Sequence, residues 1–158
     1  AIDPRNTGAL ATAGDAELEL RDYAEAEKIY AKLSQEDSTA PVQARLARLA
    51  ELKGDPARAI ELLRQNLGTA AEGVWYRVRL GELYFRKGDL EKADEHYAFA
   101  RQLRPESYLV REHLAELRAA QGKFDEALAL YQQVVAMVPR AAFFHALADL
   151  YGFMSHPV

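Results

Sequence analysis

One pattern of residues recurs along the chain at intervals of 33, 34 and 34 positions, counted from turn pairs that start at 21, 54, 88 and 122. An alanine follows each turn pair at a fixed offset, and a large side chain follows four residues later: Ala26 and Tyr30, Ala59 and Leu63, Ala93 and Tyr97, Ala127 and Tyr131. A tiny residue precedes each pair by seven positions, at Gly14, Ala47, Gly81 and Ala115. A fixed period of this length is typical of repeat architectures, so it constrains the fold more than any local propensity.

Apolar residues within one period follow helical spacing. Val74, Val78, Leu80, Leu83 and Tyr84 mark one face, and Ala93, Tyr97, Ala100 and Leu103 mark the next. A glycine in the turn pair can adopt positive φ and end the first helix, while an acid or a proline suits the start of the second. One pair cannot bury both faces, so the pairs must stack. We expect first helices near 9–20, 42–53, 74–87, 108–121 and 141–154.

The best copy of the pattern reads Arg77-x-x-Leu80-Gly81-x-x-Tyr84, then Ala93-x-x-x-Tyr97, then Pro105. It resembles the tetratricopeptide repeat (TPR) family, although Arg77 stands where that family often has tryptophan. Four copies in register make the resemblance specific. It implies an all-α fold, a right-handed α-solenoid of stacked antiparallel helix pairs.

The resemblance also implies a division of the chain into repeats. We expect repeat 1 at 7–39, repeat 2 at 40–73, repeat 3 at 74–107 and repeat 4 at 108–140, in one solenoid domain. Residues 1–6 then form the tail of a preceding repeat, because Pro4 lies 34 residues before the closing position at Ser38. Residues 141–158 form the first helix of an incomplete fifth repeat. The chain is therefore expected to be a fragment of a longer array.

Composition narrows the classes of partner. A formal charge of −4 and a pI of about 5.6 give no bulk attraction to nucleic acid or to an anionic membrane. No stretch of about 18 apolar residues is present to span a bilayer, and Ala1–Pro4 does not resemble a signal peptide. The chain has no cysteine, which excludes thiol catalysis and disulfides. Its compartment stays open.

Motifs for catalysis or cofactor binding are missing from the sequence. No glycine-rich phosphate loop and no Gly-x-Ser-x-Gly elbow occurs, so we expect a protein that is not an enzyme and has no cofactor. His113 has Glu112 and Glu116 close by, and His145 has Asp149 one turn later. Without further ligands fixed by sequence, these pairs favour a polar surface over a metal site. His96 is likewise expected at a surface or interface.

In TPR proteins the first helices line a concave groove that binds peptides. The resemblance assigns the groove-facing repeat positions, or columns, of that family to residues of this chain. The candidate groove residues are Arg48, Trp75, Val78, Glu82, Phe85, Arg86, Leu109, Glu112, Glu116, His145, Asp149 and Phe153. The scaffold does not itself demand large apolar residues at Trp75, Phe85 and Phe153. Acids outnumber bases, so the expected partner is a protein or peptide with basic and apolar residues. The lysines and asparagines of chaperone-binding TPR proteins are absent from these columns.

Three functions from different classes remain open. The favoured one is a non-catalytic scaffold that binds proteins or peptides. The alternative is a regulatory or substrate-recruiting segment of a larger enzyme, and RNA binding is the third, disfavoured by the acidic balance. The last helix also predicts self-association, because Phe143, Phe144, Leu147, Leu150 and Tyr151 include an apolar face that would meet water.

Overall fold

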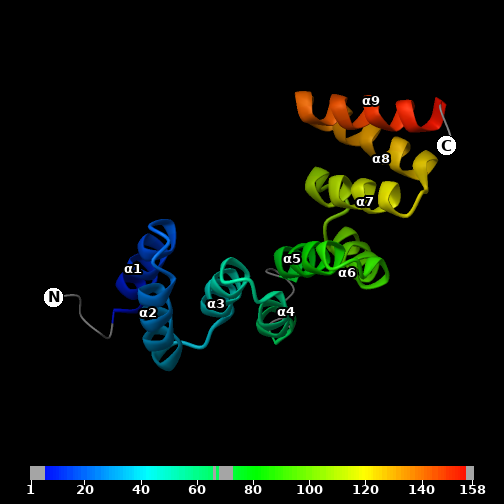
Figure 1. Ribbon diagram of the computed structural model, residues 1–158. Coiled ribbons are helices and arrows are strands. Elements are labelled where there is room, and N and C mark those ends of the chain that lie inside the picture. Colours follow the sequence, from blue (N-terminus) through cyan, green and yellow to red (C-terminus); the bar gives the residue numbers. More distant parts are fainter. Residues whose placement is uncertain (1–5, 66, 68–72, 156–158) are drawn as a thin grey trace. The chain divides into compact units, whose positions relative to one another are not determined.

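The computed structural model describes residues 6–65, 67 and 73–155, and every regular element in these ranges is an α-helix (Figure 1). The chain forms two units, residues 1–68 and 69–158. Unit 1 contains α1 (Thr7–Glu19), α2 (Tyr23–Glu36), α3 (Ala40–Leu52) and α4 (Pro56–Arg64). Unit 2 contains α5 (Gly73–Arg86), α6 (Leu90–Leu103), α7 (Tyr108–Ala120), α8 (Phe124–Met137) and α9 (Ala141–Ser155).

The odd-numbered helices are the first helices expected from the sequence, and their observed ends fall within two residues of the expected ones. In unit 1, α1 packs on α2 and α3 on α4, and α2 also contacts α3. In unit 2, α5 pairs with α6 and α7 with α8, while α6 contacts α7 and α8 contacts α9. This confirms the all-α fold of stacked helix pairs. The tail expected at 1–6 falls almost entirely outside the described residues.

The turns inside the pairs share one backbone hydrogen bond, and all except the turn at Lys123 also have an aspartate that caps the second helix. Gly88 has a φ of 81°, and the N–H of the next residue, Asp89, donates a 2.9 Å hydrogen bond to the carbonyl of Tyr84. The Asp89 carboxylate then accepts a bond from the N–H of Lys92 and caps α6. Arg21 occupies the equivalent position without being glycine, and its φ is 62°. The tight turn holds each second helix antiparallel to its first helix.

The small and bulky columns meet inside each pair. A Cβ added to Gly81 would overlap the ring of Tyr97, and one added to Gly14 would overlap the ring of Tyr30. The second-helix alanines are fully buried: Ala26, Ala59, Ala93 and Ala127. In unit 1 this close packing also brings the Tyr30 hydroxyl to Asp15, the residue that follows Gly14. In unit 2 the residue that follows Gly81 is Glu82.

Candidate interaction surface

The predicted groove residues lie on first helices, but they differ in accessibility. Arg48 is exposed on α3 of unit 1, and the other eleven belong to unit 2. Exposed members in unit 2 are Trp75, Arg86, Leu109, Glu116, His145, Asp149 and Phe153, and half-buried members are Glu82, Phe85 and Glu112. Val78 is buried, so it contributes to packing and offers little area to a partner. The candidate surface therefore lies mainly in unit 2, in which α7 contacts α5.

His113 brings together the carboxylates of two successive first helices. Its Nε2 atom lies 3.2 Å from Oε1 of Glu82 on α5. Its buried Nδ1 atom is 3.5 Å from Oε2 of Glu116 on α7, which is within ion-pair distance but forms no hydrogen bond. The imidazole stacks on the ring of Tyr97, with centroids 5.3 Å apart and planes 9° from parallel. Arg79 forms an ion pair with the other oxygen of Glu82.

This environment changes the acidity of two groups. Burial of the imidazole lowers the pKa of His113, but contact with Glu116 and the negative charges of Glu82, Glu116 and Glu112 outweigh burial, so that pKa is raised. Partial burial also raises the pKa of Glu112, and the neighbouring charge of Glu116 adds to the effect. The face of α5 and α7 thus carries three carboxylates, Glu82, Glu112 and Glu116, which are partly neutralised by the imidazole of His113 and by the guanidinium groups of Arg79 and Arg86.

Unit 1 has an equivalent bridge made from different residues. Asp15 on α1 accepts hydrogen bonds from Arg45 on α3, at 2.9 Å from Nε and 3.0 Å from Nη2. The hydroxyl of Tyr30 donates a 2.7 Å bond to the same carboxylate. Partial burial raises the pKa of Asp15, but the bonds from Arg45 and Tyr30 together lower it below its usual value. Neither Arg45 nor His113 was predicted to form a bridge. The signal was a base two residues before the small column and an acid one residue after it.

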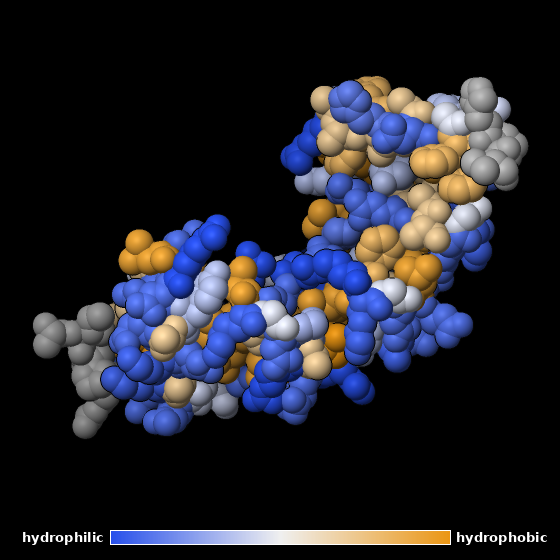
Figure 2. Space-filling model, in the orientation of Figure 1, coloured by the Kyte–Doolittle hydropathy of each residue, from blue (hydrophilic) through white to orange (hydrophobic). Residues whose placement is uncertain are grey.

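Apolar side chains flank the acidic surface in unit 2. Trp75 is 52% exposed and meets Tyr76 edge to face, and Leu109 is 44% exposed on the next first helix. Phe153 is 63% exposed and stacks on Phe124, with ring centroids 6.2 Å apart. The view in Figure 2 shows apolar surface over α8 and α9. A partner could therefore contact apolar and acidic groups on the same unit.

His96 lies at an interface and not at the surface, the two positions expected for it. It is buried against α5, where its ring stacks on Tyr84 with centroids 5.5 Å apart, and Nη1 of Arg77 lies 3.3 Å from its Nδ1. This residue beside Tyr97 thus faces the partner helix of its own pair. Across the described ranges, no set of three or more His, Asp or Glu residues is arranged to hold a metal ion.

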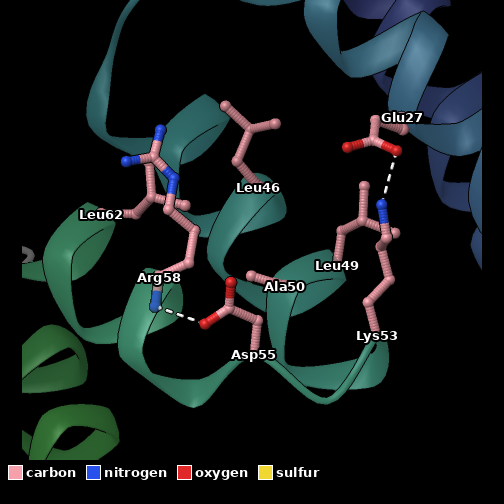
Figure 3. A pocket seen from close by; sticks show the side chains of 8 residues that line it. All are labelled: Glu27, Leu46, Leu49, Ala50, Lys53, Asp55, Arg58 and Leu62. Carbon is pink, nitrogen blue, oxygen red and sulfur yellow. Dashed lines mark hydrogen bonds and ion pairs between the residues drawn. The ribbon is translucent and has the colours of Figure 1, made fainter.

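A small pocket of about 200 Å³ lies in unit 1 between α2, α3 and α4 (Figure 3). Its lining comprises Glu27, Leu46, Leu49, Ala50, Lys53, Asp55, Arg58 and Leu62. Lys53 Nζ and the Glu27 carboxylate pair at 2.6 Å beside it, and the Arg58 side chain lies across it. The volume is below that of ordinary ligand sites, and none of the predicted groove residues lines it.

Comparison with solved structures places the fold in a known class. A tetratricopeptide repeat protein from Parabacteroides merdae superimposes with a TM-score of 0.82 at 20% identity, covering 98% of this chain and 61% of that one. PilF from Pseudomonas aeruginosa gives 0.79 at 21% identity, covering 94% of this chain and 69% of that one. YrrB, described as a TPR protein with an unusual peptide-binding site, gives 0.73 at 17% identity and covers 91% and 75%. This chain thus spans less than two thirds of the Parabacteroides protein.

These similarities show an all-α helical-repeat fold. Models of the tetratricopeptide repeat match residues 11–73 and 74–140. The chain belongs to the tetratricopeptide repeat family, whose repeats generally serve as scaffolds for protein–protein interaction. No curated protein matches it in sequence. Among the helices of the described ranges, none is both long and apolar enough to cross a membrane.

Proposed function

We propose that unit 2 binds a peptide or protein segment that carries basic and apolar residues, through the exposed side of its first helices. The observation that supports this most is the charge of the first-helix column. Glu82, Glu116 and Asp149 occupy one column of α5, α7 and α9, and Glu112 lies one turn away from Glu116. Trp75, Leu109 and Phe153 supply exposed apolar area on the same helices.

Binding would follow from a surface that is already in place. The helices fix the carboxylates before the partner arrives, so little ordering cost falls on the scaffold. Carboxylates near a surface attract a basic segment and fix its register, and the exposed aromatic residues add affinity. YrrB is a fold neighbour described with a peptide-binding site, which supports a peptide ligand by analogy of fold.

Two features distinguish the proposed ligand from an acidic one. In unit 1 the only acid of the same column, Asp15, is already paired with Arg45, and Arg48 adds an exposed positive charge to that column. In unit 2, Arg86 is the exposed arginine among the predicted residues. An acidic anchor on the ligand would therefore be restricted to the neighbourhood of Arg86 or Arg48, and the main recognition would be of basic groups.

The test compares charge reversals on two faces of unit 2. Glu82→Lys with Glu116→Lys changes the proposed face, and Glu91→Lys with Glu95→Lys makes the same net charge change on exposed positions of α6. The probe is a blocked decapeptide of alternating leucine and arginine, measured by calorimetry at 50 and 300 mM salt.

We expect the first pair of changes to weaken binding about tenfold or more at low salt, and by less at high salt because of screening. The α6 control should change affinity by about twofold at most, through long-range charge alone. Equal effects of the two double variants, or unaltered affinity in Glu82→Lys with Glu116→Lys, would show that the peptide does not bind to this face.

A further inference from the structure

The two inter-helix bridges occupy the same repeat positions but respond differently to protons. Arg45 stands two residues before Ala47, and His113 stands two residues before Ala115. Each base crosses from its own first helix to the acid of the preceding one, Asp15 or Glu82. A guanidinium stays charged at any physiological pH, whereas an imidazole gains or loses its charge near neutrality.

Charged and titratable groups surround His113 on every packed helix. Helix α5 contributes Glu82, which is paired with Arg79, α6 contributes Tyr97, and α7 contributes Glu112 and Glu116. Tyr131 of α8 and Arg140, which precedes α9, interact electrostatically with Glu112. The three carboxylates act on the imidazole directly. Burial raises the pKa of Tyr131 to about 12, and the charges of Glu116 and Glu112 add to it, so the same field reaches α8.

We propose that His113 is a proton-dependent clamp between α5 and α7, and that its proton also sets the negative charge that unit 2 offers to a basic ligand. When protonated, the ring joins Glu82 and Glu116 and holds the two first helices together. When neutral, it can donate one hydrogen bond at most, and both carboxylates lose its positive charge, so that Glu82 keeps only the ion pair with Arg79. The second half of the proposal rests on the proposed function; the clamp itself does not.

The direction of the pH effect on stability follows from the raised pKa of His113. A base that binds its proton more tightly in the folded state than in the unfolded state stabilises the fold below its unfolded pKa, near 6.5. That contribution is lost as pH rises through the folded value. The Asp15–Arg45 bridge behaves oppositely, because the lowered pKa of Asp15 makes its contribution disappear only in acid.

The direction of the effect on binding is the reverse. Loss of the His113 proton leaves Glu82, Glu112 and Glu116 facing the ligand with one positive charge fewer among them. A basic peptide should therefore bind more tightly at pH 9 than at pH 6. By linkage, the bound peptide should stabilise the proton-free form and lower the pKa of His113.

The clamp is tested on the full chain without a ligand. Proton NMR should place the pKa of the His113 ring above 6.5 in the wild type and lower it in Glu82→Gln. In urea unfolding, the wild-type midpoint should fall by about 0.5 M between pH 6 and 9 relative to His113→Arg, which carries a fixed charge as at Arg45. Arg45→His should create the same dependence in unit 1. A His113 pKa at or below 6.5, or one insensitive to Glu82→Gln, would overturn the clamp even if His113→Arg failed to fold.

The ligand half is tested with the blocked leucine–arginine decapeptide. Wild-type affinity should rise about three- to fivefold from pH 6 to 9 beyond any change seen in His113→Arg, which shares every other titrating group. Equal pH profiles of the two proteins would overturn the coupling while leaving the proposed function intact. Absence of peptide binding at both pH values would overturn the proposed function and the coupling together, and would leave the NMR result for the clamp unaffected.

Discussion

The ring of Tyr97 rests directly on the backbone of Gly81, so that even a methyl group at position 81 would overlap it. Tyr97 is 1% exposed, and its neighbour Ala93 is fully buried on the same helix. The same relationship holds between Tyr30 and Gly14 in unit 1. The pairs α1/α2 and α5/α6 are therefore each held by a contact between a glycine backbone and an aromatic ring, and this contact leaves no space for a side chain at the glycine.

Replacing Gly81 with alanine should destabilise unit 2. The added methyl group must displace the Tyr97 ring or the α5 backbone, at a cost of about 1–3 kcal/mol that exceeds the gain in helix propensity. The measurement is the free energy of unfolding in urea. Gly152→Ala is the matched control, because Gly152 lies in a helix with nothing within 4 Å of its Cβ position, and it should stabilise by about 0.5–1 kcal/mol. Equal effects of the two changes would contradict the packing role of Gly81.

Enlarging the buried alanines should have a similar cost. Ala127→Leu, like Ala93→Leu, places three more carbon atoms in a fully closed contact, and we expect about 1–3 kcal/mol of lost stability or more. Ala129→Leu makes the same chemical change at an exposed position of α8 and should be within about 0.5 kcal/mol of the wild type. An unchanged denaturation midpoint for Ala127→Leu would be the unfavourable result.

Arg21→Gly should stabilise unit 1. Arg21 is the one described non-glycine residue with positive φ, at 62°, and the left-handed region costs an L-residue about 1 kcal/mol that glycine avoids. Allowing for the greater freedom of glycine in the unfolded chain, the expected gain is about 0.5 kcal/mol. Thermal unfolding of this variant should be compared with Gly88→Ala, which places the same strain into an equivalent turn and should lose about 1 kcal/mol.

The outer side of α9 should make the chain associate as its concentration rises. Phe144 and Tyr151 are each 52% exposed, and Ala148 between them is exposed although its counterpart Ala115 is fully buried. Sedimentation across a wide concentration range should show this association, because apolar side chains gathered on one face favour contact with a second copy. Phe144→Ser with Tyr151→Ser should reduce it.

Leu20→Ser is the control for the α9 prediction, since Leu20 is 75% exposed and belongs to unit 1. It should leave association unchanged. A monomer at every concentration, with α9 still helical, would refute the role given to this face.

The helices could be predicted because the same pattern of residue types occurs in each repeat. Gly81, Ala93 and Tyr97 are ambiguous singly, but their columns recur at a fixed period, so the first helices were located to within two residues. Even Arg21 was placed in a turn by register, despite its poor intrinsic preference for that conformation.

The electrostatics of the surface could not be predicted in the same way. His113 was expected on a polar surface because its neighbours on its own helix are acids, yet its closest carboxylate contact is Glu82, 31 positions earlier. The repeat period predicts the contacts that recur inside every helix pair. A bridge joins residues at different repeat positions of two successive repeats, so the period does not predict it. The burial of Val78 and His96 likewise depends on the helix that covers each of them, which spacing along a single helix does not specify.

The lengths of the segments also indicate where residues can be gained or lost. Helices α2, α6 and α8 each have 14 residues, and α3 and α7 each have 13. The segment between α2 and α3 has three residues and the one between α6 and α7 has four, which accounts for intervals of 33 and 34. One residue added inside a helix would rotate everything after it by about 100° and carry the small column off its tyrosine. Natural insertions and deletions, and engineered ones such as tags or loops, should therefore be accepted between helix pairs and rejected within them.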